Sequence, residues 1–240
     1  MFELETDQDL RRFVGNHASA LRRSTRRHSE WAADEIEACV WDRMRGHRCG
    51  LAICPRCARD TRLRLLNWAE SAPHSEAALV TSYLKSVAFG DLCGADLERL
   101  KRNFRQQLVR GGVGMKALGG IETAWEAATS SWLIHAHHIA LDLQPEDRSR
   151  LKDVAKSLSR PRAIKVQPIK EGELDYTATY CLKLGLMVSS RSNAKSRRNF
   201  RIRMPSAPAT ELAEFLAGHG PDDFLFPIGF RRRGASIELA

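Results

Sequence analysis

The chain has 240 residues, of which 43% are hydrophobic and 28% charged, and 38 basic against 29 acidic residues give a formal net charge of +9. This composition excludes wholesale disorder, and the length suits one domain or one domain with a small appendage. No apolar stretch approaches the ~20 residues of a membrane span, and the acidic, polar start is unlike a secretory signal. We therefore expect a cytoplasmic protein without a membrane partner. Its basic excess favours nucleic acid as the partner, with a merely solvated basic surface as the alternative.

The N-terminal part of the chain combines arginine-rich helical patterns with a cysteine cluster. Residues 1–38 and 59–70 have apolar side chains near helical spacing, and the cysteines between them are interrupted by Gly46, Gly50 and Pro55, which mark turns. We assign residues 1–70 to this arginine-rich helical arm with its cysteine module.

The remainder of the chain alternates predicted strands and helices. Strands are expected over four segments: 77–89, 117–127, 132–143 and 162–169. Helices are expected over four others: 95–110, 147–159, 173–187 and 208–216, the last with Thr210 as a possible cap. The two middle strands form a predicted hairpin. This order predicts an α+β fold with a central antiparallel sheet covered by helices over residues 71–204, and residues 205–240 add a C-terminal helix and basic tail.

Four of the six cysteines lie close together, at Cys39, Cys49, Cys54 and Cys57. The Cys54-Pro-Arg-Cys57 knuckle is typical of a structural Zn²⁺ site, in which four thiolates close a tetrahedron around the metal. His47 is an alternative to Cys39 as the fourth ligand. A redox pair and four small buried side chains are the other interpretations, both weaker because four cysteines are crowded together without a thioredoxin-like context.

A histidine pair on the predicted strand 132–143 indicates a second metal site. His135 and His137 alternate with Ala136 and so share one face of the strand, whereas His138 points to the other. An antiparallel neighbour would place Glu122 beside the pair as a third ligand. One oxygen and two nitrogen ligands suit Mg²⁺ or Mn²⁺ with open positions, although such a pair also occurs in zinc hydrolases and on ordinary polar strands.

Two tyrosines on the predicted helix 173–187 supply a possible nucleophile. Tyr176 and Tyr180 are four residues apart and share a helical face, to which Lys183 also belongs. A nearby lysine favours the phenolate, and a tyrosine beside a metal-polarised phosphodiester can form a covalent intermediate. The alternative is a pair of core tyrosines packed on the sheet.

In this order the motifs resemble those of the rolling-circle replication initiators (Rep proteins) of small plasmids, members of the HUH endonuclease family. The resemblance covers residues 39–187 and rests on the CPxC cluster, the strand 78–85, GGIET with Glu122, the tryptophan-led HAH segment from Trp132, and Tyr180-Cys-Leu-Lys183. It implies an RRM- or ferredoxin-like nuclease palm.

The resemblance also implies roles for these residues. His135, His137 and Glu122 would hold catalytic Mg²⁺ or Mn²⁺, while Tyr180 would nick single-stranded or hairpin origin DNA through a 5′-phosphotyrosine, with Lys183 supporting it. The free 3′-hydroxyl would prime synthesis, with a host helicase and polymerase as partners, since the chain has no phosphate-binding loop of its own. Tyr176 stands where some plasmid initiators have a glutamate, which is similar to two-tyrosine members, and Ala136 is smaller than the residue usual between the histidines.

Two other function classes fit the same residues. An HUH-type single-strand transposase combines a cysteine-rich module with the same chemistry, and a zinc-containing DNA-binding regulator would use the histidines and tyrosines only structurally. A metal hydrolase using water is a third. A basic segment is expected to hold the DNA backbone through Arg191, Lys195, Arg197, Arg198, Arg201 and Arg203.

Overall fold

The computed structural model describes residues 6–41, 48–72, 75–156, 163–182, 187–190, 200–233 and 236–239. Its helices are α1 (Asp7–Arg22), α2 (Ser29–Trp41), α3 (Pro55–Ser71), α4 (Leu97–Arg110), α5 (Pro145–Lys156), α6 (Leu174–Tyr180) and α7 (Ser206–Ala217), with 3-10 turns η1 (Leu92–Gly94) and η2 (Pro221–Phe224). Its strands are β1 (Ala77–Ala88), β2 (Lys116–Glu126), β3 (Ser131–Leu141), β4 (Ile164–Pro168), β5 (Met187–Ser190), β6 (Phe200–Arg203), β7 (Phe230–Arg233) and β8 (Ser236–Leu239). None of the described helices combines the length and the apolar character that a membrane crossing requires.

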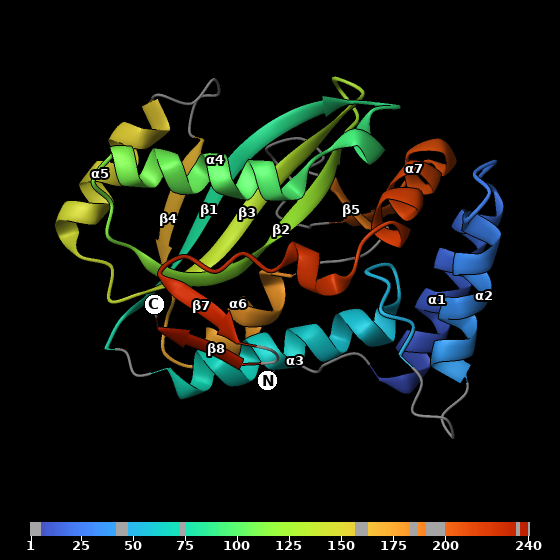
Figure 1. The fold of residues 1–240 in the computed structure, drawn as a ribbon, viewed down its shortest axis with the longest axis horizontal. Coiled ribbons are helices and arrows are strands. Elements are labelled where there is room, and N and C mark those ends of the chain that lie inside the picture. Colours follow the sequence, from blue (N-terminus) through green and yellow to red (C-terminus); the bar gives the residue numbers. More distant parts are fainter. Residues whose placement is uncertain are drawn as a thin grey trace.

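A four-stranded antiparallel sheet in the order β2-β3-β1-β4 lies at the centre (Figure 1). The predicted hairpin is present as β2 and β3, whose register pairs Glu122 with His135 and Trp125 with Trp132. The prediction of an α+β fold with a central antiparallel sheet is therefore confirmed. Two short hairpins, β5–β6 and β7–β8, lie outside this sheet.

The two faces of the sheet differ in how well they are covered. On one face, Trp132, Ile134, Ala136 and His138 of β3 are all fully buried beneath α4, α7 and the C-terminal segment. On the other face, covered in part by α6, several side chains stay half-buried, among them Thr81, Glu122 and His135, whereas His137 is buried. Among the described residues, the sheet therefore has one fully buried core face and one face that is buried only in part.

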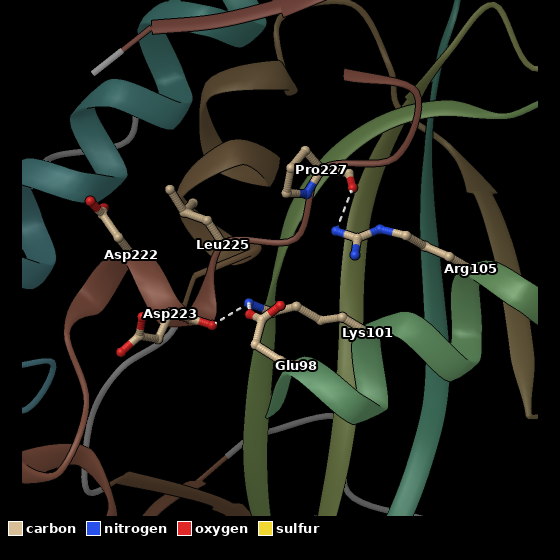
Figure 2. Close-up of a pocket in the computed structure, with 7 residues that line it drawn as sticks. All are labelled: Glu98, Lys101, Arg105, Asp222, Asp223, Leu225 and Pro227. Atoms are coloured by element: carbon tan, nitrogen blue, oxygen red, sulfur yellow. Dashed lines mark hydrogen bonds and ion pairs between the residues drawn. The ribbon is translucent and has the colours of Figure 1, made fainter. Parts of the chain in front are cut away.

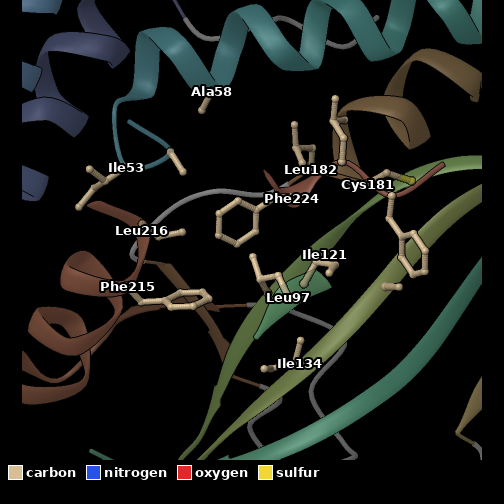
Figure 3. Packing of buried hydrophobic residues seen from close by; sticks show 14 of the residues in the cluster. Ile53, Ala58, Leu97, Ile121, Ile134, Cys181, Leu182, Phe215, Leu216 and Phe224 are labelled. Carbon is tan, nitrogen blue, oxygen red and sulfur yellow. The ribbon is translucent and has the colours of Figure 1, made fainter. Parts of the chain in front are cut away.

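One hydrophobic core joins all three sequence regions. Figure 3 shows Ile53 and Ala58 from the N-terminal region, Ile121 and Ile134 from the sheet, and Phe224 from the C-terminal region around a common interior. Burial of apolar surface is the main favourable contribution to folding, so the stability of the N-terminal region is linked to that of the sheet.

The N-terminal helices use much of their arginine content to hold the fold together. α1 and α2 pack side by side at one end of the molecule, next to α7 (Figure 1). Arg22 of α1 reaches Asp34 and Glu37 of α2 at 2.9 and 2.8 Å, and these carboxylates raise the pKa of Arg22. Arg26 pairs with Glu214 of α7 at 2.8 Å. Several arginines of the predicted basic arm are thus paired with acids of the same chain.

The C-terminal segment closes the outer edge of the sheet. Backbone hydrogen bonds join Ala117 of β2 to Ile228 and Gly119 to Phe226, which leaves less of this strand free to pair with other chains. Figure 2 shows how α4 fixes the segment: the ammonium of Lys101 donates to the carbonyl of Asp223 at 2.5 Å and Arg105 donates to that of Pro227 at 3.2 Å. The adjoining cavity of about 210 Å³ is lined by two basic and three acidic residues, which are Lys101, Arg105, Glu98, Asp222 and Asp223.

Two details of the sequence-based prediction were wrong. The helix expected over 173–187 ends at Tyr180, and Met187 already belongs to β5. The apolar residues at 182, 184, 186 and 188 alternate with a period of two, a pattern that favours extended backbone. Thr210 does not cap the last helix, because α7 begins at Ser206 after Pro205, and the Thr210 hydroxyl donates instead to the carbonyl of Ala20 at 3.4 Å.

Candidate active site and metal centre

The four clustered cysteines converge on one point. Their sulfur atoms all lie within 4.8 Å of one another, with Cys57 at 3.9 Å from Cys39 and 3.7 Å from Cys49. Four sulfurs at ~2.3 Å from a tetrahedral Zn²⁺ would stand ~3.8 Å apart, so the spacing matches. The cluster can hold a metal such as zinc. It is the only group of at least three potential ligands this close among the described residues, and His47 lies outside them.

The electrostatics of the cluster require a cation if all four sulfurs are to be thiolates. Hydrogen bonds from the thiols of Cys49, Cys54 and Cys57 lower the pKa of Cys39, whereas Cys39 and the other neighbours raise the pKa of Cys54. The neighbouring thiols thus favour a negative charge on Cys39 and Cys57 and oppose it on Cys49 and Cys54. A divalent cation removes this conflict, since metal-bound thiols lose their protons.

Helix placement explains how these cysteines meet. Cys39 lies on α2, Cys54 immediately precedes α3, and Cys57 is in the first turn of α3. His17 of α1 holds the loop between them: its Nδ1 donates to the carbonyl of Ile53 at 2.7 Å. Burial lowers the pKa of His17 to about 4, so this imidazole is neutral at pH 7. The cluster therefore joins α2 to α3, and His17 attaches α1 to the loop beside it.

The three histidines of β3 lie on the faces that strand alternation predicts. His135 and His137 lie on the same face with their ring centroids 6.2 Å apart, whereas His138 stacks on Phe104 of α4 on the core face at 6.3 Å. Burial lowers the pKa of His138 to about 3. His138 is therefore a neutral part of the core, and the other two histidines lie on the opposite face of the sheet.

Glu122 contacts His137 most closely. Although its register partner is His135, its Oε2 lies 2.7 Å from the Nε2 of His137, the diagonal neighbour on the same face. The other ring nitrogen of His137, Nδ1, is 3.0 Å from the Oγ1 of Thr81 on β1. With 4% of its surface exposed, His137 is a buried imidazole held at both ends.

His135 completes the set only in part. It is half-buried, and its ring lies 6.0 Å from that of Tyr83 in an edge-on contact. Together with His137 and Glu122 it does not form a cluster in which all ligand atoms lie within 4.8 Å. The pair His137–Glu122 is thus preformed, and His135 has to turn toward it before all three groups can share one ion.

The tyrosines of α6 lie against these histidines. The ring of Tyr180 packs edge-on against that of His137 at 5.1 Å, and the ring of Tyr176 lies 6.4 Å from that of Tyr180. Tyr176 is 56% exposed, whereas Tyr180 is half-buried. The two tyrosines therefore share one side of α6, with Tyr180 nearer to the sheet.

A glycine in β2 permits this approach. Gly120 is the register partner of His137, and a Cβ added to it would stand 2.7 Å from the carbonyl oxygen of Cys181, the residue after α6. Real Cβ atoms do not come this close to backbone. The end of α6 can sit beside the histidines because Gly120 has no side chain.

Some predicted site residues lie outside the described part of the chain. These are Lys183, Arg191, Lys195, Arg197 and Arg198. Arg201 and Arg203 belong to β6, but their side chains are not among those described. The prediction that a basic segment contacts DNA stays a prediction for all of them.

Thr81, Tyr83 and Gly120 contribute to the site but were not singled out from the sequence. Thr81 and Tyr83 are two residues apart on β1 and so lie on one face of this strand, which is a usable signal. Only the register of β1 against β3 shows that they face His137 and His135.

Comparison with known proteins identifies no relative: no family model matches the chain, and neither a curated protein nor a solved structure is significantly similar to it. The functional argument therefore rests on the residues and their geometry.

Proposed function

We propose that the protein is an HUH-type tyrosine endonuclease that initiates rolling-circle replication by nicking and joining single-stranded or hairpin origin DNA. The observation that carries the proposal is the packing of Tyr180 on His137, at 5.1 Å between ring centroids, beside Glu122 on the partly buried face of the sheet. His137 follows Glu122 by 15 residues in the sequence, and Tyr180 follows it by 58. The proposed nucleophile and the nitrogen–oxygen donor pair thus come from three separate segments.

The donor set fits a divalent cation. The nitrogen of His137 and the carboxylate of Glu122 face each other at 2.7 Å, close to the separation of two ligands on one small ion, and His135 stands on the same face. These three residues would hold Mg²⁺ or Mn²⁺, whose role is to polarise the scissile phosphate. The four cysteines would hold structural Zn²⁺.

The residues of the chain then have distinct tasks. The Tyr180 hydroxyl loses its proton and its oxygen attacks phosphorus, which forms a 5′-phosphotyrosine bond and breaks the bond to the 3′-oxygen. The 3′-oxygen leaves with the electron pair and takes up a proton, and the free 3′-hydroxyl can prime synthesis. Tyr176, exposed on the same side of α6, would carry out a second strand transfer. Lys183 would support the phosphate, and the basic residues of 191–203 would hold the backbone.

The test is a covalent adduct assay. Full-length protein is incubated with Mn²⁺ and a labelled single-stranded DNA pool with a randomised segment, and denaturing gels with peptide mapping locate any attached DNA. The wild type should form an adduct at Tyr180, and Tyr180→Phe should lose it while still binding DNA. Tyr176→Phe is the matched control on the same helix and should keep the first nick.

Other outcomes would select another function. Cleavage without an adduct would indicate attack by water, and an adduct mapped to Tyr176 would reassign the nucleophile. Unchanged DNA binding by all variants, with no cleavage even of the DNA they bind, would favour the zinc-containing regulator. Two further products would distinguish an initiator from a transposase. An initiator leaves a nicked 3′ end that an added polymerase extends, whereas a transposase joins two DNA ends, which sequencing of the captured DNA would reveal.

A further inference from the structure

Thr81 is the one described side chain that holds the far nitrogen of His137. The register of β1 and β3 sets the two residues opposite each other, and Oγ1 lies 3.0 Å from Nδ1. Threonine is branched at Cβ, so few rotamers are open to it in a strand, and the hydroxyl is held toward the ring. Since His137 is 4% exposed, water has little access to take the place of this contact.

The contact with Glu122 determines which way the Thr81 hydroxyl works. A carboxylate only accepts hydrogen bonds, so the 2.7 Å contact requires a proton on Nε2 of His137. In the neutral ring, Nδ1 then has a lone pair and accepts a hydrogen bond from the Thr81 hydroxyl. When a cation takes the place of the proton between Nε2 and the carboxylate, the single ring proton must sit on Nδ1, and Nδ1 then donates to Thr81.

A hydroxyl suits both arrangements because it donates and accepts. By rotating about its C–O bond, Thr81 can supply a proton in the metal-free ring and accept one in the metal-bound ring, without moving either strand. An amide or carboxylate at this position would favour one form, and an apolar side chain would leave a buried ring nitrogen without a partner in both.

We propose that Thr81 is a positioning residue that orients His137 for a divalent cation and keeps its hydrogen bond in both the metal-free and the metal-bound state. The inference rests on the proposed function, because it assumes that His137 and Glu122 bind the catalytic cation. Outer-shell partners of metal-bound histidines typically contribute about 10–100-fold to metal affinity.

The experiment compares Thr81→Val, Thr81→Ser and Thr123→Val in the full-length, zinc-loaded protein. Valine keeps the shape of threonine and removes the hydroxyl, whereas serine keeps the hydroxyl. Thr123 is next to Glu122 but is paired with Ile134, so its side chain points to the other face and it serves as the control. Mn²⁺ dissociation constants come from electron paramagnetic resonance titration, adduct formation is measured over a series of Mn²⁺ concentrations, and thermal melting verifies folding.

Thr81→Val should weaken Mn²⁺ binding by about 10–100-fold and shift the Mn²⁺ dependence of adduct formation by the same factor, with the yield recovered at saturating Mn²⁺. Thr81→Ser and Thr123→Val should stay close to wild type. Wild-type affinity in Thr81→Val, equal weakening in Thr81→Ser, or a loss of adduct that saturating Mn²⁺ does not restore would each overturn the role of Thr81. A wild type that binds no Mn²⁺ and forms no adduct would overturn the proposed function with it.

Discussion

The cysteine cluster and the histidine–tyrosine site show two ways in which one chain assembles chemically active side chains. The four cysteines come from a 19-residue stretch, three of them are buried, and all four sulfurs already lie within 4.8 Å of one another. The histidine–tyrosine site draws on β1, β2, β3 and α6 on a half-open face, and only part of the set is in contact. The first arrangement is typical of a closed structural centre, and the second of a site that keeps room for a substrate.

This difference predicts that damage to the two regions has different consequences. Loss of the cysteine centre should destabilise the fold, since the centre joins α2 to α3 and both helices contribute to a core shared with the sheet. Loss of a side chain from the histidine–tyrosine site should reduce the reaction and leave the fold intact.

The largest effect is expected from the cysteine centre. Structural Zn²⁺ contributes an apparent ~10–16 kcal/mol in small zinc domains, as much as the whole stability of many proteins. Cys57→Ser, or treatment with a strong chelator, should release the metal and unfold the N-terminal helices, measured by elemental analysis and circular dichroism melting. Cys93→Ser, outside the cluster, is the control. A melting curve unchanged by chelation would show that the cluster is not a structural metal centre.

Two neighbouring histidines offer a sharper contrast. His137→Ala should reduce adduct formation by more than the roughly 10–100-fold that loss of an outer-shell partner costs, with a modest loss of stability. His138→Ala, one residue along, opens a cavity between Phe104 and Phe226, so it should lower the free energy of unfolding by a few kcal/mol and retain adduct formation. Both variants are compared by the rate of adduct formation and by the free energy of unfolding in urea. Equal effects of both would refute the assignment of the two faces.

Gly120→Ala tests how α6 is positioned. The new Cβ would meet the carbonyl oxygen of Cys181 at 2.7 Å, so the end of α6 must shift away from the sheet. We expect a loss of about 1–3 kcal/mol of stability and a roughly tenfold slower adduct reaction, since misplacing a reacting group by about 1 Å costs up to ~100-fold. Gly94→Ala, where a Cβ meets nothing within 4 Å, is the control. An unaffected reaction would show that the approach of α6 does not depend on Gly120.

The smallest effect is a pH dependence of stability from His17. Burial lowers the pKa of His17 from 6.5 to about 4. Between pH 6.5 and 4, His17 is therefore protonated in the unfolded chain but neutral in the folded protein. The contribution of His17 is complete above pH 6.5 and is lost as the pH falls toward 4, by roughly 2 kcal/mol at pH 5. Urea unfolding at pH 7.5 and 5 should therefore show a smaller loss of stability on acidification for His17→Gln than for wild type. Parallel losses would contradict this.

The sequence alone predicted the central antiparallel sheet, the cysteine cluster and the faces on which the strand histidines lie. Strand alternation placed His135 and His137 on one face and His138 on the other, and the cysteine spacing predicted a single cluster. Both patterns are local: side chains two apart on a strand, or three apart in a CxxC knuckle, have their relation set by backbone geometry.

Only the tertiary structure decided which groups meet across strands. Glu122 was expected beside the histidine pair, but its close contact is with the diagonal His137, and the parts played by Thr81 and Gly120 depend on strand register and on the approach of α6. Register and helix packing are fixed by burial of the whole core rather than by residues near the site. Arg22 of α1 and Arg26 in the following turn illustrate the same limit. Their presence is visible in the sequence, but their pairing with acids on α2 and α7 is determined by which helices pack together.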